Sequence, residues 1–434
     1  MKQKPLTRFY KIAAVVMSVA FLAAGCGSKS TGNTGPITIK IWKTFEDSDN
    51  LQALFDEYQQ KHPNVQIVYT KKNVDTYEAD LVDALASGSG PDIFSIHNDW
   101  LPRYLDKISP APDATFLYKD YKNTFVDTVV QDFTKDNKIY GTAMAVDSLG
   151  LYYNKDIMGS AGIAVPPKTW DELAAHVQRL KKSDGKGYFT RSGVAMGTNS
   201  NVNRAVDILY LLMLQKRTVP FNADGTEPLF NQDISVNGNR IYPGQAALDY
   251  YTSFANPVSL NYNWNARSDY SIDAFANGRA AYLYSYSYTR QSLLQKNPNL
   301  NFDVAPVPQP DLDQPAVNFS NYWGEVVSKQ GKNQAVAWDL LKFLSSKNSL
   351  DKYYAKNKQP SSRKDMIELQ INDPEIGVFA NANLTAKSFY KPSQVKIDDI
   401  FAKAIDNVIL NGVSVSDAMS QAEQQAAVVA RSYQ

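Results

Sequence analysis

The fold is decided by residues 37–96, which read ITIKIWKTFEDSDNLQALFDEYQQKHPNVQIVYTKKNVDTYEADLVDALASGSGPDIFSI. Short segments typical of strands alternate here with segments whose apolar residues follow the period of a helix. This order favours an α/β fold with a largely parallel sheet and helices on both of its faces. The expected elements are strands at 37–42, 65–69 and 92–96 and helices around 51–58 and 77–85.

Further elements are expected along the rest of the chain. Residues 136–156 look like strands around a turn, and Thr169 with Glu172 forms a capping box that starts a helix. The apolar run LYLLML at 209–214 predicts a buried helix or strand. Residues 215–270, which are rich in Asn, Asp, Gly, Pro and Tyr, predict loops and short pieces.

Length and composition exclude some classes of protein. The 434 residues favour more than one lobe and are enough to bury a sizeable core. The 45 Lys and Arg residues balance 44 Asp and Glu residues. A general binder of nucleic acid or of acidic membranes would need a basic surplus, so we expect no nucleic-acid partner.

The N-terminus carries a processing signal rather than a part of the fold. A basic segment without acids precedes the apolar run IAAVVMSVAFLAA, and Gly25 and Cys26 follow. This order resembles the bacterial lipoprotein signal, in which the cysteine is lipidated and becomes the mature N-terminus. We expect a signal peptide at residues 1–25, lipidation of Cys26 and a flexible tether at residues 26–36. An ordinary secretion signal with an incidental cysteine is the alternative.

The sequence lacks the motifs of common enzyme classes. GxSxG, HExxH, the P-loop and GxGxxG are absent, and the three histidines have no spacing that suggests a metal site. Acids near the expected strand ends could still form the carboxylate pair that hydrolyses glycosides. The alternative for each of them is a solvated loop acid or a helix cap. These acids are Glu46, Asp47, Asp99 and Asp147.

Polar and aromatic residues follow two of the expected strands. Phe45, Glu46 and Asp47 come after the first strand, and HNDW at 97–100 comes after the third. Ligands of open α/β sheets bind outside the carboxyl ends of strands, so these groups should converge at one edge. Acids, amides and rings together suit a neutral polyol, which stacks its C–H face on a ring and pairs its hydroxyl groups.

Several segments, in order along the chain, resemble the extracellular solute-binding proteins of bacterial carbohydrate ABC importers, the maltose-binding-protein-like group. They are WKTFED, SGSGPDIFSIHNDW, IYGTAMAVDSLGLYYNKDIM, AGIAVPPKTWDEL and FANGRAAYLY. The resemblance implies a two-lobe, periplasmic-binding-protein-like fold of type II with the ligand cleft between the lobes. It implies a first lobe of residues 37–146 and 318–358 and a second lobe of residues 147–317 and 359–434. The proline-rich segment at 305–315 is expected to connect the lobes.

The resemblance also implies which residues contact the sugar. The family's positions fall on Glu46 and Asp47 after the first strand, Asp99 after GPDI, Asp147 before YYNKD, Tyr286 or Tyr288 after FANGRAA, and Phe401 in the helix after KPSQ. The sequence departs from the pattern at Ile96, where a relative carries tryptophan, although Trp100 is near. The segment SNYWGEVVSK resembles the re-entry into the first lobe and brings Trp323 toward the cleft.

Alternate tyrosines occupy the stretch AAYLYSYSYTR at 280–290. Because a strand has a period of two, all four rings would project from one face. We expect Tyr282 and Tyr284 to lie in the core or on the sheet face. Tyr286 and Tyr288, at the far end, are expected to open into the cleft and stack on sugar. The alternative is that all four pack internally.

These observations predict a binding protein without enzymatic activity and without a cofactor. We expect a lipid-anchored monomer on the outer face of the cytoplasmic membrane, which captures a sugar or oligosaccharide and delivers it to the permease subunits of an ABC importer. Two alternatives remain open. One is a secreted glycosidase, and the other is a solute-binding protein for a polyamine, an amino acid or a metal chelate.

Overall fold

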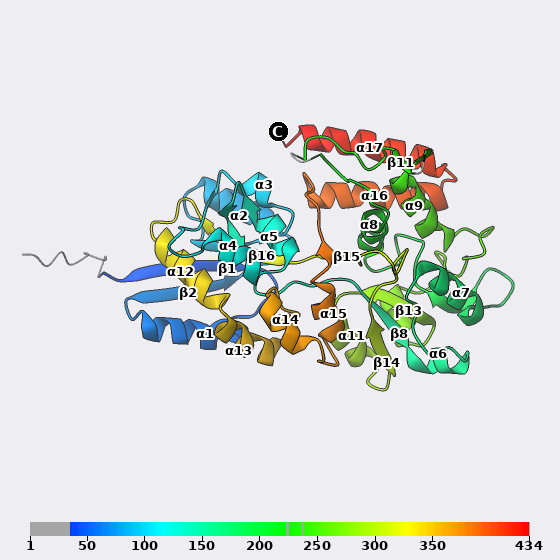
Figure 1. Ribbon diagram of the computed structural model, residues 1–434, viewed down its shortest axis with the longest axis horizontal. Helices are drawn as coiled ribbons and strands as arrows, with labels where there is room; N and C mark the ends of the chain where they lie inside the picture. The colour runs from blue at the N-terminus through cyan, green and yellow to red at the C-terminus, as the bar shows by residue number, and fades with distance from the viewer. Residues whose placement is uncertain (1–34, 223–224, 237, 434) are drawn as a thin grey trace, which may run out of the picture.

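Two lobes, each built around its own sheet, lie side by side in the computed structural model of the chain (Figure 1). The structure describes residues 35–222, 225–236 and 238–433. The expected signal peptide, Cys26 and most of the tether lie outside these residues. Within them, no helix combines the length and the apolar character that a membrane span requires.

The sheet of the first lobe has the strand order β2-β1-β3-β16-β4, and β7 also pairs with β16. β1 runs parallel to β2 and to β3, as the sequence predicts. β16, which comes from far along the chain, joins antiparallel to β3 and places Trp323 opposite His97. This pairing puts Trp323 at the same sheet edge as the carboxyl ends of β1 and β3. The strands are β1 (Ile37–Lys43), β2 (Val65–Lys71), β3 (Ile93–His97), β4 (Ile108–Ser109), β7 (Gly141–Thr142) and β16 (Trp323–Ser328).

The sheet of the second lobe has the order β14-β8-β13-β10-β9. The tyrosine strand β13 lies in its middle, antiparallel to β8 and parallel to β10. The strands are β8 (Gly150–Asn154), β9 (Lys182–Ser183), β10 (Phe189–Val194), β13 (Ala280–Ser285) and β14 (Phe302–Ala305). Three small pairs complete the sheets: β5 (Thr134–Lys135) with β6 (Lys138–Ile139), β11 (Ile234–Val236) with β12 (Asn239–Ile241), and β15 (Asn318–Phe319) with β17 (Ala386–Lys387).

Helices cover both sheets, and α16 and α17 lie together over the second lobe (Figure 1). Those that pack on the first core are α1 (Ser48–Lys61), α2 (Tyr77–Ala86), α3 (Leu101–Tyr104), α4 (Tyr118–Thr124), α5 (Asp127–Phe133), α12 (Gln334–Leu344), α13 (Lys347–Asn357) and α14 (Lys364–Gln370). Those that pack on the second core are α6 (Lys155–Ser160), α7 (Trp170–Leu180), α8 (Ala205–Gln215), α9 (Pro243–Ser253), α10 (Ser271–Ala276), α11 (Thr289–Lys296), α16 (Gln394–Ile409) and α17 (Val415–Arg431). α15 (Gly377–Ala382) touches both cores.

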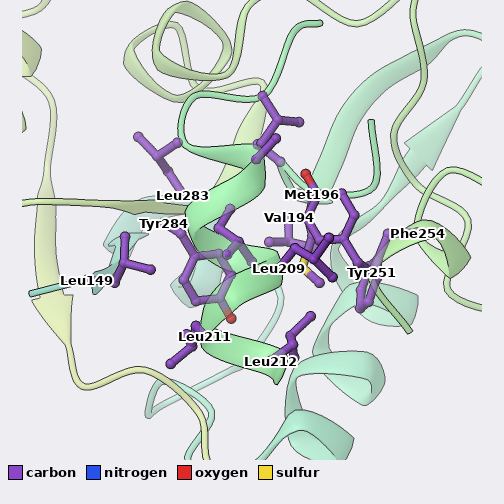
Figure 2. Close-up of a cluster of buried hydrophobic side chains, with 14 of the residues drawn as sticks. Leu149, Val194, Met196, Leu209, Leu211, Leu212, Tyr251, Phe254, Leu283 and Tyr284 are labelled. Atoms are coloured by element: carbon purple, nitrogen blue, oxygen red, sulfur yellow. The ribbon is translucent and has the colours of Figure 1, made fainter. Parts of the chain in front are cut away.

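The second core is centred on α8, the helix that contains LYLLML. Leu209, Leu211 and Leu212 of α8 pack with Val194 of β10 and Tyr284 of β13 (Figure 2). Nearly every side chain of α8 is buried, which explains why its sequence shows no polar face. The capping box is confirmed, because Thr169 Oγ1 accepts a hydrogen bond from the backbone N–H of Glu172 and the Glu172 carboxylate accepts from the backbone N–H of Thr169.

One expectation about secondary structure is wrong. Residues 215–270 are not only loops and short pieces, because they contain α9. Pro243 occupies the first turn of this helix, where its missing N–H costs nothing. Ala247, Leu248 and Tyr251 then recur at helical spacing on its buried face. The many Asn, Gly and Pro residues around this short helix hide its pattern.

The chain crosses between the lobes at positions that partly correct the expected boundaries. Val146 packs in the first core and Leu149 in the second. The proline-rich segment at 305–315 is not a crossing, because Phe319 beyond it still belongs to the second core. The chain was expected to return to the second lobe at residue 359. This boundary is too early, since Met366 and Ile367 of α14 pack in the first core. Their apolar side chains bind α14 to the first lobe.

A buried asparagine holds the first crossing segment in place. Asn383 donates from its side-chain amide to the backbone oxygens of Val146, at 2.7 Å, and of Ser361, at 3.1 Å. Its side-chain oxygen accepts from the Ser148 hydroxyl at 2.6 Å. Asn383 therefore connects the crossing at residues 146–148 to the segment that precedes α14, where a hinge between the lobes would act.

Candidate functional site

A cavity of about 650 Å³ lies between the lobes, a size common for small-molecule sites. The first lobe contributes residues 43–46 at the end of β1, residues 321–325 around the start of β16, and residues 356–360 at the end of α13. The second lobe contributes residues 287–294 at the start of α11. Asp147, in the first crossing segment, also lines the cavity.

The floor of the cavity holds a lysine between two carboxylates. Lys43 Nζ lies 2.6 Å from Glu46 Oε2 and also pairs with Glu325. Burial alone would lower the pKa of Lys43, but Glu325 and Glu46 raise it above its usual value. Burial raises the pKa of Glu325 against the opposing effect of Lys43. Glu325 Oε2 is buried and has no hydrogen-bond partner among the described residues, so this carboxylate keeps an unused acceptor atom.

Aromatic rings reach the cavity from both lobes. On the first lobe, Phe45 is 60% exposed and meets Trp323 edge to face, with their ring centroids 5.7 Å apart. Trp323 is half-buried and packs behind against Trp100, at 5.2 Å between centroids. On the second lobe, Tyr288 is 55% exposed at the start of α11. These rings supply apolar faces on opposite walls.

Asp147 fixes the loop that carries Tyr288. Its carboxylate accepts hydrogen bonds from the backbone N–H of Ser287, at 3.0 and 3.1 Å, and from the Ser287 hydroxyl at 2.7 Å. Burial raises the pKa of Asp147 to about 6, and the hydrogen bonds from Ser287 oppose this effect. Asp147 therefore both lines the cavity and holds the loop before α11 in place.

The cavity brings together only some of the residues expected at the site. Glu46, Asp147, Tyr288 and Trp323 line it. Asp47 is next to Glu46 but points to solvent, where its side chain is 73% exposed and pairs with Lys71 at 2.8 Å. Asp47 does not line the cavity, contrary to the expectation. It stands instead directly before α1, at the N-cap position.

Asp99 and Trp100 are also misplaced by the sequence-based expectation. Asp99 is buried, and one of its carboxylate oxygens lies 2.6 Å from His97 Nδ1. Burial would raise the pKa of Asp99, but His97 and Lys391 hold it below its usual value. Trp100 is buried in a stack with Tyr104, at 5.6 Å between ring centroids. Both side chains are occupied by protein partners and do not reach the cavity.

Tyr286 and Phe401 belong to the core of the second lobe, not to the cavity. β13 ends at Ser285, so the alternation of the strand does not continue to Tyr286. Tyr286 is fully buried and donates to Asp207 at 2.8 Å. Phe401 is fully buried and packs against Tyr210 and Phe230. The expectation that Tyr282 and Tyr284 are core residues is confirmed.

A lysine connects the lobes beside Asp99. Lys391 is buried, and its Nζ lies 3.4 Å from Asp99 Oδ2 of the first lobe and 3.1 Å from Asp398 Oδ1 in α16 of the second lobe. The same ammonium lies 5.0 Å from the centre of the Tyr210 ring. Burial would lower the pKa of Lys391, but Asp398 and Asp99 raise it above its usual value. The lysine is therefore charged and pairs with both lobes.

Several residues of the cavity were not expected from the sequence. Lys43 could have been found, because it ends the first strand at the edge where ligands bind. Arg290 directly follows the tyrosine run, but a single arginine on a short helix gives no signal. Tyr353 donates to Glu46 and also contacts Gln359 at 3.0 Å, and nothing in its sequence context indicates this position.

Comparisons with known proteins agree on one family. Residues 53–378 match the family model described as bacterial extracellular solute-binding protein. The galactooligosaccharide-binding protein of Bacillus subtilis is 22% identical over 379 residues, which cover 86% of this chain and 83% of that protein. The multiple sugar-binding protein of Streptococcus mutans is 21% identical over 374 residues, which cover 83% of this chain and 84% of that protein.

Solved structures share the fold. The cyclic α-maltosyl-1,6-maltose binding protein of Arthrobacter globiformis superposes with a TM-score of 0.76 at 19% identity. The alignment covers 92% of this chain and all of that chain. At this identity the likeness supports the two-lobe, type II fold alone.

Proposed function

Because the chain belongs to the bacterial extracellular solute-binding proteins, we propose that it captures a sugar or oligosaccharide between its lobes and delivers it to the permease of an ABC importer. The observation that carries this proposal is the composition of the cavity. Trp323 and Phe45 of the first lobe and Tyr288 of the second all line it, together with charged and amide side chains. A sugar needs such a set, because it has apolar C–H faces and a ring of hydroxyl groups.

The aromatic and the charged side chains of the cavity contact different parts of the sugar. Trp323 and Tyr288 stack on the faces of the sugar rings. Glu325 and Glu46 accept hydrogen bonds from hydroxyl groups, and the ammonium of Lys43 pairs with both carboxylates. Because the ligand contacts both lobes, it stabilises the closed arrangement relative to an open one. Delivery then requires that the permease favour opening.

The same geometry favours binding over hydrolysis. A retaining or inverting glycosidase needs one carboxyl group as acid and another as nucleophile or base. In this cavity Glu46 and Glu325 share one lysine, and Tyr353 also donates to Glu46. Neither carboxylate is left to act independently. The named relatives bind sugars, which supports a sugar over a polyamine, an amino acid or a metal chelate.

The place of the protein in the cell follows from its N-terminal sequence. We propose cleavage before Cys26, lipidation of that residue, and a monomer anchored to the outer face of the cytoplasmic membrane. The first strand begins at Ile37, so a short tether would separate the lobes from the lipid. An anchored binding protein remains near its permease, which raises its effective concentration there.

The proposal predicts tight and specific sugar binding that depends on Trp323. Calorimetric titration with galacto-, malto-, arabino- and manno-oligosaccharides should find at least one ligand, without release of new reducing ends. Trp323→Ala should weaken that ligand at least tenfold, about 1.4 kcal/mol, because the stacking face is lost. Trp42→Ala is the matched control, since Trp42 is also half-buried but lies outside the cavity. Equal loss in both variants, or cleavage of the sugars, would contradict the proposal.

A further inference from the structure

Arg290 presents an unused guanidinium group to the cavity. It lies in α11 on the wall of the second lobe. Its Nε and Nη1 atoms are buried and have no hydrogen-bond partner among the described residues. The carboxylate recorded closest to it is Glu375, whose Oε1 lies 3.9 Å from Nε, too far for a hydrogen bond. Buried donors without partners are costly, so this arrangement indicates a missing acceptor.

The guanidinium group is also held in position. It lies over the ring of Phe302 in β14, with 5.1 Å between the guanidinium carbon and the ring centre. Stacking on a ring restricts the movement of the side chain. A planar fork of N–H donors matches a carboxylate, which can accept two parallel hydrogen bonds. The site is therefore prepared for an anionic, planar group.

The first lobe adds positive charge to the lining. Lys356, in the last turn of α13, and Lys358, directly after that helix, line the cavity. Lys356 Nζ bonds to the backbone oxygen of Asp49 at 2.6 Å, and it forms no ion pair with a carboxylate among the described residues. Lys358 pairs with Asp373 at 3.0 Å. Cations from both lobes therefore line the cavity, and Glu375 is the acid that lies near the guanidinium group.

Another part of the lining has the opposite character. There one lysine, Lys43, stands between Glu46 and Glu325. The two carboxylates repel an anion and accept hydrogen bonds from neutral hydroxyl groups. A ligand that satisfies the whole cavity therefore carries its negative charge beside Arg290 and neutral hydroxyl groups beside Glu46 and Glu325.

We propose that the ligand is an acidic oligosaccharide, with a uronic acid carboxylate bound by Arg290. This inference rests on the proposed function, because it assigns a ligand class to the same cavity. The carboxylate accepts from the guanidinium edge, and Lys356 on the opposite lobe adds electrostatic attraction. The acidic group thereby bridges the lobes, as the stacked rings do.

The test compares acidic sugars with their uncharged esters. Di- and trisaccharides of galacturonate, glucuronate and mannuronate are titrated calorimetrically, each beside its methyl ester, at 20 to 200 mM salt. The wild type should bind one acidic form at least tenfold more tightly than its ester, and added salt should narrow this difference. Arg290→Gln should reduce the preference for the acidic form over its ester to about threefold or less, while the ester still binds. Arg279→Gln is the control, because Arg279 pairs with Asp269 and does not line the cavity.

The outcomes separate this inference from the proposed function. If neutral sugars bind and acidic forms bind equally or more weakly, the acidic ligand class is wrong and the sugar-binding function stands. An acidic preference that persists in Arg290→Gln would show that another residue binds the carboxylate. If neither neutral nor acidic sugars bind, both the inference and the proposed function fail.

Discussion

Replacing Lys391 by alanine is expected to lower the free energy of unfolding by about 3–5 kcal/mol, because it removes one partner of a buried ion pair. The ammonium of Lys391 lies between Asp99 and Asp398, and the Asp99 and Lys391 side chains are almost fully buried. Without the lysine, Asp99 keeps its hydrogen bond with the His97 ring, and Asp398 loses its ion pair. The measurement is chemical denaturation of the ligand-free protein.

An exposed Lys–Asp pair on α16, the helix that carries Asp398, provides the control. Lys403 and Asp399 are four residues apart on α16 and exposed, with N–O distance 2.6 Å. Exposed pairs of this kind contribute about 0.3–0.5 kcal/mol, so Lys403→Ala should change stability little. Similar effects of the two substitutions would show that Lys391 does not hold the lobes as the structure indicates. A loss of cooperativity in Lys391→Ala would instead indicate that the lobes unfold separately.

The second large effect is expected at Tyr286 and Tyr288, two tyrosines of the stretch at residues 280–290. Tyr286→Ala should destabilise the protein by about 3–5 kcal/mol, because truncation of a buried aromatic side chain leaves a cavity in the core. It also removes the hydroxyl group that donates to the buried carboxylate of Asp207. Sugar affinity of the folded fraction should be nearly unchanged, since Tyr286 does not line the cavity.

Tyr288→Ala should show the opposite pattern. This ring is more than half exposed, so its removal should cost less than about 1 kcal/mol of stability. Sugar binding should weaken at least tenfold, because the second lobe loses its stacking surface. Paired thermal melts and titrations of both variants make the comparison. If Tyr288→Ala melted early and bound normally, its ring would serve the fold rather than the ligand.

Most of the fold could be predicted from local periodicity. The parallel arrangement of β1, β2 and β3 follows from the alternation of strands and helices between residues 37 and 97. β16 could not be placed in this way, because its partners lie far away in the sequence. The lobe boundaries were harder to predict for the same reason. α14 is held in the first lobe by Met366 and Ile367, and no local signal distinguishes this from packing on the second lobe.

Glu46 could be predicted from its position just after a strand, because ligands of α/β sheets bind at that edge. Asp147, Tyr288 and Trp323 were assigned to the site by resemblance, and all three line the cavity. Phe401 was assigned to the site by resemblance, but it belongs to the apolar stripe of α16 and therefore faces the core. Asp99 also follows the end of a strand, but its carboxylate pairs with Lys391 and is not available to a ligand. Such a long-range partner has no local signature.

Hydrogen–deuterium exchange with the tightest sugar ligand tests the central claim most directly. If the sugar binds between the lobes, exchange should slow in both of them, in residues 43–50 and 321–325 of the first lobe and residues 287–294 of the second. The smaller hollow of about 220 Å³ beside Trp170 and Tyr250 should exchange as before. Protection confined to one lobe, or centred on that smaller hollow, would contradict capture of the sugar in the cavity between the lobes.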